Sequence, residues 1–405
     1  MSKWEEDLVF VELALSIDQY LPGYVDAYYG PDEIPKKIRE DGKAPLTALE
    51  QKAQELAESI AQDSSLAAGR KEYLLGEVGA MQTSLRLLQG ESLGIIEEVQ
   101  ALYGLTPEWV DESVFEEAHH SLEQLLPGEE PLADRMIAFR EYFEVSSEAA
   151  VPVIKRLFQD FQSRTKQRFS LPDSESCVFE FVHDQPWSAY NWYLGDYQSR
   201  IDFNLDLPIR VYSLPNLIAH EGYPGHHTEH AIKEQRLYQD GGRLEHSILP
   251  SNTPAAVISE GIAEVALEMI FTPAEQVECY RQITAEVGIS RYDGEQIYEI
   301  LRVFRQSLAS VGDNKLLLLH QNGASDDEVI KYGRHYALTS EKQERQSLKF
   351  AKDPLWRSYG FNYSLGYQII HNYLAESEIR DQDFSRLLHE AVTPAQVLRW
   401  TEQGI

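Results

Sequence analysis

Apolar residues return every three or four positions along most of this chain, and this spacing limits its possible folds more than any other feature. In WEEDLVFVELALSIDQYL, residues 4–21, the spacing places the apolar side chains on one face of a helix. The same pattern predicts further helices over residues 46–62, 70–89, 111–126, 130–143, 147–166, 213–238, 254–270, 273–288, 292–311, 325–337, 359–376 and 393–402. The sequence therefore predicts a mostly α fold.

Three segments depart from the helical pattern. CVFEFV (177–182) and SRIDFNLDLP (199–208) alternate in polarity and carry β-branched or aromatic residues, which predicts a small β-sheet just before the histidine-rich segment at 219–230. PGYVDAYYGPDEIP (22–35) interrupts the first helices with Pro, Gly and Asp and is rich in tyrosine. We expect an N-terminal helical lobe over 1–170 and a second helical lobe, with the small sheet and the histidine-rich segment, over 171–405, placed around a central groove or joined as one continuous domain.

The charge of the chain excludes two classes of partner. Its 405 residues include 36 Lys and Arg against 66 Asp and Glu, a formal net charge of −30. This charge repels nucleic-acid phosphates and anionic lipids, so we expect neither nucleic acid nor membrane as a partner. The start, MSKWEEDLVF, is acidic where a secretory signal is basic and then apolar, and no apolar run has the length of a membrane span. We expect a cytoplasmic location, and no pattern indicates an oligomeric state.

Several residues that could carry chemistry have a simpler structural explanation. Cys177 and Cys279 are far apart and lack C-x-x-C spacing, so we expect inert thiols rather than a disulfide or a thiolate metal site. His119 and His120 lie on a helix face in FEEAHHSLEQLL, where a structural role is expected.

A histidine-rich segment, AHEGYPGHHTEH (219–230), has the composition of a metal site but an unusual spacing. In a regular helix, two histidines four residues apart can share one zinc ion while a glutamate between them reaches the attacking water. Here the next histidines after His220 are His226 and His227, six and seven positions on. Seven positions give a rise of about 10 Å, and six turn the side chain away by about 120°. A straight helix cannot build this site.

Pro224 and Gly225 offer a way to build it. Proline lacks the N–H of a continuing helix, and glycine tolerates the resulting loop, so we expect the chain to leave the helix here. Either His226 or His227 could then take the place of the second ligand. His226 and His230, four apart, form a competing pair, and a His-rich surface helix after a turn is the plain structural alternative.

A second helix offers a third ligand. ISEGIAEVALEMIF (258–271) carries Glu260 and Glu264 four residues apart, hence on one face, among apolar residues that make idle carboxylates costly. Glu260 as a metal ligand and Glu264 as the residue that orients a ligating imidazole is a consistent assignment. The alternative is two solvated glutamates on an amphipathic helix.

These motifs support a resemblance. HEGYPGHH, followed by SEGIAEVALE, resembles the bacterial family called domain of unknown function 885, whose fingerprint is H-E-x-x-P-G-H-H and then E-G-W-A. That family is similar to the helical gluzincin metallopeptidases, which include carboxypeptidase Taq and angiotensin-converting enzyme. YNWY and RIDFNLDLP are similar to the strand region before the active helix, and PGYVDAYYGP is similar to a recurring segment of the family. Ile262 departs from the usual tryptophan, and HHTE from His-His-Leu-Gln.

The resemblance implies a gluzincin-like fold and a set of site residues. Zinc is expected on His220, one of His226 and His227, and Glu260, with Glu221 as the general base and Glu264 behind a ligand. WRSYGFNYSLGYQII (356–370) resembles the tyrosine-bearing helix that stabilises the tetrahedral intermediate, with Tyr363 as the candidate and Tyr359 and Tyr367 one turn to either side.

The function expected from these residues is a zinc-dependent metallopeptidase, of carboxypeptidase or dipeptidase type, acting on a peptide or small amide. Two alternatives remain open: a zinc hydrolase of other amides or esters, and a non-catalytic helical binding protein. Arg302, Arg305 and Arg357 are each able to clamp a terminal carboxylate, although a surface salt bridge is the ordinary role of such residues.

Overall fold

The computed structural model describes residues 3–184, 189–206 and 209–403, and helices make up most of them. The predicted mostly α fold is confirmed. The first part of the chain forms α1 (Lys3–Asp18), α2 (Glu33–Asp41), α3 (Leu46–Gln62), α4 (Ala68–Leu88), α5 (Ile95–Tyr103), α6 (Glu112–Leu125), α7 (Leu132–Tyr142) and α8 (Ser147–Arg168).

Two of the helices that follow the small sheet lie where one longer helix was predicted. The helix expected over 213–238 is divided into α9 (Leu214–Glu221) and α10 (His226–Lys233), because the chain leaves the helix after Glu221. The later helices are α11 (Pro254–Ile270), α12 (Pro273–Glu286), α13 (Gly294–Gln306), α14 (Val311–His320), α15 (Asp326–Tyr336), α16 (Glu341–Ala351), α17 (Phe361–Ala375), α18 (Arg380–His389) and α19 (Pro394–Gln403). None of the helices in the described residues is long and apolar enough to cross a membrane.

The strands form three small sheets. The largest has the order β3-β5-β4, with β3 (Ser176–Val182) parallel and β4 (Ala189–Gly195) antiparallel to β5 (Gln198–Asn204). The strand predicted over 177–182 is present, and the one predicted over 199–208 ends at Asn204, with residues 207–208 outside the described residues.

The two other sheets join distant parts of the chain. β1 (Val25–Tyr28) pairs with β7 (Ile248–Pro250), and β2 (Glu144–Val145) pairs with β6 (Ile209–Arg210), both antiparallel. β1 also contacts β4. The tyrosine-rich segment that interrupts the first helices is thereby fixed beside the small sheet.

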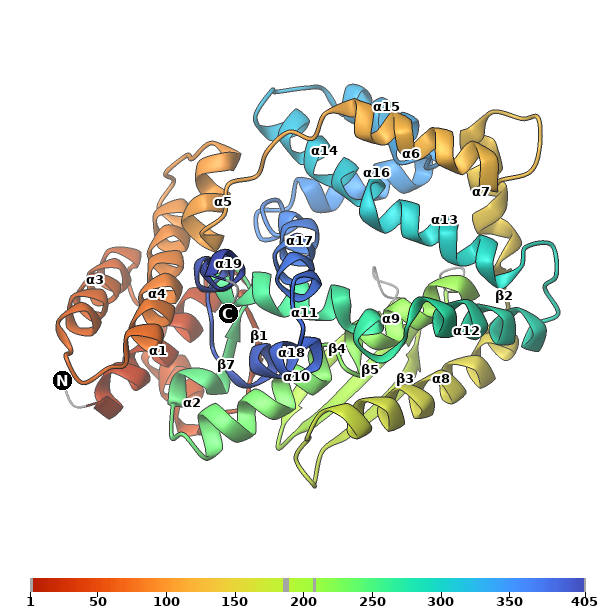
Figure 1. Cartoon of the computed structure of the whole chain (residues 1–405). Helices are drawn as coiled ribbons and strands as arrows, with labels where there is room; N and C mark the ends of the chain where they lie inside the picture. The colour runs from red at the N-terminus through yellow and green to blue at the C-terminus, as the bar shows by residue number, and fades with distance from the viewer. Residues whose placement is uncertain (1–2, 185–188, 207–208, 404–405) are drawn as a thin grey trace.

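Helix α11 lies in the middle of the molecule, crossed by α17 and flanked by α9 (Figure 1). Most of its side chains are apolar and most of its residues are buried, as expected of a helix that neighbours surround. At the crossing, a Cβ on Gly261 would lie 2.5 Å from the carbonyl oxygen of Gly366, and one on Gly366 would lie 2.6 Å from the carbonyl oxygen of Val257. Only glycine on both helices permits this close approach.

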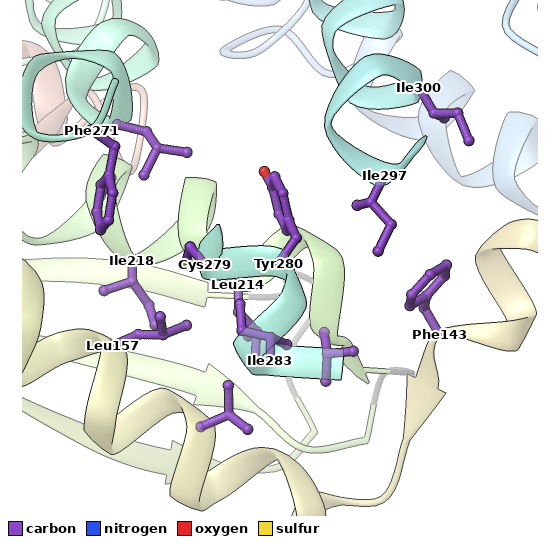
Figure 2. Packing of buried hydrophobic residues seen from close by; sticks show 14 of the residues in the cluster. Phe143, Leu157, Leu214, Ile218, Phe271, Cys279, Tyr280, Ile283, Ile297 and Ile300 are labelled. Atoms are coloured by element: carbon purple, nitrogen blue, oxygen red, sulfur yellow. The ribbon is translucent and has the colours of Figure 1, made fainter. Parts of the chain in front are cut away.

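The buried apolar residues form clusters that join both predicted lobes. The largest cluster combines α8 and the sheet with α9, α12 and α13, and Figure 2 shows part of it around Leu157, Ile218 and Ile283. A second cluster packs α1, α3 and α4 against Leu244 and Ile248. The lobe boundary at residue 170 stays a prediction, and side chains from both sides of it share these cores.

Replacing Gly261 by alanine tests the helix crossing. The added methyl group meets backbone atoms of α17, so we expect the free energy of unfolding to fall by about 1–3 kcal/mol. Gly79→Ala on α4 is the matched control, because a Cβ there meets no atom within 4 Å, and it should stabilise by about 0.5–1 kcal/mol. Denaturant unfolding measures both, and equal stabilities of the two variants would contradict the close crossing.

Candidate metal centre

The junction between α9 and α10 turns the chain back onto the end of α9. The Tyr223–Pro224 peptide bond is cis, and the Gly225 amide donates to the carbonyl oxygen of Ala219 at 2.9 Å. A Cβ on Gly225 would lie 1.9 Å from the carbonyl oxygen of His220, so no other residue fits this turn. The interruption places α10 so that its first residue, His226, faces His220.

Two imidazoles and one carboxylate converge at this junction. Glu260 Oε2 lies 3.4 Å from His220 Nε2 and 3.9 Å from His226 Nε2. The three ligand atoms lie within 4.8 Å of one another, and the two rings are perpendicular. Two ligands of a tetrahedral zinc ion are about 3.4 Å apart at normal bond lengths. The spacing of these atoms therefore fits such an ion with little adjustment.

One oxygen of Glu260 supports this fit. The side chain is buried, and Oε2 has no hydrogen-bond partner in the described structure, whereas Oε1 accepts from the Tyr359 hydroxyl at 2.7 Å. A buried carboxylate oxygen without a partner is costly unless a cation compensates it. The residues present thus fit a divalent metal bound through nitrogen and oxygen.

The pKa shifts of the residues in the cluster also indicate that these surroundings favour positive charge. Burial lowers the pKa of His220, but the carboxylates of Glu260 and Glu264 outweigh it and hold this pKa well above its ordinary value. Burial raises the pKa of Glu260, but His220, His226 and Tyr359 outweigh it and the pKa is lowered. The protein environment therefore keeps Glu260 anionic and favours positive charge beside it, which a protonated His220 or a metal ion supplies.

Each candidate histidine ligand has a carboxylate behind it. Glu264 Oε1 lies 3.4 Å from His220 Nδ1, the ring nitrogen that does not face Glu260. This is the position predicted for Glu264. A carboxylate there fixes the ring orientation and raises the basicity of the other nitrogen.

The hydrogen bonds that hold the His226 ring in place were not predicted from the sequence. Its Nδ1 lies 3.1 Å from Ser259 Oγ, and the Ser259 hydroxyl donates to Glu229 Oε2 at 2.6 Å. Since Ser259 gives its proton to Glu229, its oxygen accepts the Nδ1 proton of His226, and Nε2 keeps the lone pair that faces Glu260. Sequence shows only that Ser259 precedes a candidate ligand and that Glu229 lies three residues after His226.

The competing pair, His226 and His230, forms a second possible cluster with Glu229. In this cluster the carboxylate of Glu229 is already occupied by the Ser259 hydroxyl and by Lys233 Nζ at 2.6 Å. A lysine ammonium beside the carboxylate opposes a second cation. The cluster of His220, His226 and Glu260 is the better metal site.

His227 is not part of the cluster, and the prediction that kept it as a possible ligand is corrected. Its Nε2 donates to Glu175 at 2.8 Å, and its Nδ1 accepts from Ser199 at 2.8 Å. One residue along a helix turns the side chain by about 100°, which directs His227 into the core while His226 faces Glu260. Burial lowers its pKa, as expected of a neutral structural imidazole.

The cluster opens into a cleft of about 640 Å³. Glu221 lines this cleft next to His220, and its burial raises the pKa of its carboxyl group. The Asn191 amide donates to the backbone oxygen of Glu221 and fixes the end of α9. Glu221 therefore lies where a base can meet a water molecule held between the cluster and the cleft.

The three candidate tyrosines have different surroundings. Tyr363 lines the cleft, is 44% exposed, and its ring stacks at 6.4 Å on that of His220. Tyr359 also lines the cleft, but its hydroxyl is used by Glu260. Tyr367 lies in a separate cavity of about 280 Å³ with its hydroxyl 3.5 Å from Glu268. Tyr363 is the one whose hydroxyl makes no hydrogen bond within the described residues.

The other residues singled out in the sequence lie outside the cleft. Arg302 bonds Glu299, Arg305 bonds Glu268, and Arg357 bonds Glu98, the ordinary salt bridges weighed above. His119 Nε2 is hydrogen-bonded to a backbone oxygen, and His120 is exposed. Cys177 and Cys279 are free and buried.

Comparisons with known proteins show the fold. No protein-family model matches the chain, and no curated protein matches it. A "putative lipoprotein" from Colwellia psychrerythraea is similar in structure, with a TM-score of 0.52 and 16% identity over 91% of this chain and 68% of that one. A "putative lipoprotein of unknown function" from Shewanella oneidensis has a TM-score of 0.51 and 11% identity, over 88% of this chain and 72% of that one. The resemblance to the gluzincins stays a prediction.

Two neighbouring histidines allow a matched test of the ligand assignment. We expect His226→Ala to weaken zinc binding by more than about 100-fold, because a ligand is lost. His227→Ala should keep its zinc and instead lower the free energy of unfolding by about 1–3 kcal/mol, because Glu175 loses a buried partner. Elemental analysis and denaturant unfolding measure the two effects. Loss of zinc from the His227 variant would reverse the assignment.

Proposed function

We propose that this protein is a zinc-dependent hydrolase that cleaves peptide bonds, with zinc held by His220, His226 and Glu260. The observation that carries this proposal is the unpartnered Oε2 of Glu260, which faces two imidazole nitrogens at the wall of a cleft. Two imidazoles and a carboxylate are the ligand set of many catalytic zinc sites, which keep one position open. Zinc would supply positive charge that polarises a carbonyl group and lowers the pKa of a water molecule.

The chain itself supplies the proton transfers. Glu221 takes a proton from the attacking water and delivers it to the leaving amine, as a general base and then a general acid. Its raised pKa suits both roles better than that of an exposed glutamate. The Tyr363 hydroxyl, which has no partner in the described residues, donates a hydrogen bond to the oxygen on which charge develops.

The shape of the cleft supports a peptide substrate. It holds a volume typical of small-ligand sites, and its wall is rich in aromatic side chains. Residues of β4 line it, and Tyr190 and Trp192 lie on one face of this strand because they are two residues apart. An extended chain with apolar side chains fits such a wall.

We also propose that the protein works in the cytoplasm, a compartment that keeps thiols reduced, since both of its cysteines are free. The two structural neighbours are named as lipoproteins, so an anchored location is the alternative to test against. Cell fractionation separates the two.

Glu221→Gln tests the general base. The amide cannot accept the proton of the water, so we expect kcat to fall by about 10²- to 10⁴-fold while zinc stays bound. Glu376→Gln, an exposed position with the same change of charge, should keep full activity. Hydrolysis of a peptide mixture by mass spectrometry, before and after chelation and zinc return, gives the readout. An active Glu221 variant would refute this mechanism.

Tyr363→Phe tests the stabilisation of the oxyanion. Removing the hydroxyl should lower kcat by about 10²- to 10³-fold with little change in KM, because the hydrogen bond forms only in the transition state. Steady-state kinetics with the peptide that is cleaved fastest measure the changes in kcat and KM separately. A change confined to KM would assign Tyr363 to substrate binding instead.

A further inference from the structure

The cleft contains one carboxylate that the proposed chemistry does not use. Asp26 lies on β1, in the tyrosine-rich segment that interrupts the first helices, and it lines the cleft together with His220, Glu221 and Glu260. Its side chain is exposed to the cleft, and the Tyr190 hydroxyl donates to its Oδ1. Within the described residues, no lysine, arginine or histidine forms an ion pair with it.

The positively charged side chains that line the cleft already face carboxylates of the protein. Lys233 is the one lysine, and no arginine is present, among the described residues that line the cleft. Lys233 is paired with Glu229 at 2.6 Å. His230 and His246 also line the cleft, and burial lowers the pKa of both, so they stay neutral. Apart from His220 and His226, which face Glu260, the described residues that line the cleft offer no unpaired cation.

Negative charge in the cleft is in excess. Glu229 is paired with Lys233, and Glu260 would be paired with the candidate metal. Asp26 and the proposed base Glu221 form no ion pair with a lysine or arginine among the described residues of the cleft. Asp26, Glu221 and Glu260 line the same cleft, so their negative charges face one shared space. A positively charged group of the substrate would balance Asp26.

The surroundings of Asp26 suit an ammonium group. Tyr190 uses its hydroxyl to hold the carboxylate, and its ring lies 4.7 Å from that of Trp192. The Trp192 indole N–H is fixed by Asp202 at 2.9 Å, so the ring keeps its orientation in the cleft wall. A carboxylate flanked by aromatic rings binds an ammonium group through a charge-assisted hydrogen bond and cation–π attraction.

The described residues of the cleft offer no comparable binding site for the carboxyl end of a peptide. Arg302 and Arg305, which could clamp a terminal carboxylate, line the separate smaller cavity, and Arg357 is bound to Glu98. A cleft with a free carboxylate and no free cation recognises the amino end of a substrate rather than its carboxyl end.

We propose that Asp26, held by Tyr190, binds the protonated terminal amino group of the substrate, so that the protein acts as an aminopeptidase or dipeptidase. This inference rests on the proposed function for the reaction, while the binding of the amino group can be measured without any turnover.

Binding is measured by calorimetry with the zinc-loaded full-length Glu221→Gln protein. The probes are the tripeptide amide Ala-Phe-Ala-NH₂ and its N-acetylated twin, which differ only in the charge of the amino end. We expect the free amine to bind roughly 10- to 100-fold more tightly, the effect of one charged hydrogen bond. Adding Asp26→Asn should remove this preference. Adding Asp41→Asn, an exposed site outside the cleft with the same change of charge, should leave it intact.

Tyr190→Phe provides a second variant that keeps the carboxylate but removes its hydroxyl partner, and it should reduce the preference in part. Equal binding of the two peptides, or a preference that survives Asp26→Asn, would overturn the inference. The zinc-loaded wild type then separates the two proposals. If it cleaves neither peptide although binding depends on Asp26, the amino-group site stands and the hydrolase fails. If it cleaves both peptides equally well, the hydrolase stands and the amino-group site fails.

Discussion

The hydrogen bond from the Gly225 amide to the Ala219 carbonyl oxygen holds the interruption between the end of α9 and the start of α10. In a continuous helix, His220 and His226 would lie about 9 Å apart along the axis and on different sides. The turn brings both rings to one carboxylate, and it leaves no room for a Cβ at Gly225. The candidate metal site and the position of Glu221 at the end of α9 both depend on this interruption.

Helix α11 brings three carboxylates to one face, and their surroundings differ in an instructive way. Glu264 faces His220, and Glu268 is paired with Arg305. Of these three, only Glu260 has a buried oxygen with no hydrogen-bond partner in the described structure. A buried carboxylate needs compensation, so the missing charge is specific to Glu260. The close crossing with α17, permitted by Gly261 and Gly366, brings Tyr363 of that helix beside the ring of His220.

The sequence predicted most of the long helices that have a continuous apolar face, and α3 and α11 have the predicted bounds. It missed α2 and α16, whose residues are mostly polar and seldom buried. It also missed α5, α14 and α18, which bury several residues but span at most three turns. Spacing identified His220, Glu221, Glu260 and Glu264, since these lie on regular helices. It could not separate His226 from His227, because that choice depends on how the loop re-enters the helix.

Other parts of the site depend on contacts between distant segments. Ser259 and Glu229 support His226 across two helices, and Asp26 reaches the cleft through the pairing of β1 with β7 and its contact with β4. The hydroxyl of Tyr359 is another such contact. Because it occupies Oε1 of Glu260, the carboxylate offers a cation a single oxygen. Calcium requires six to eight oxygen ligands and magnesium an octahedral oxygen shell, so a donor set of two imidazoles and one oxygen would suit a softer, nitrogen-binding ion better than these hard cations.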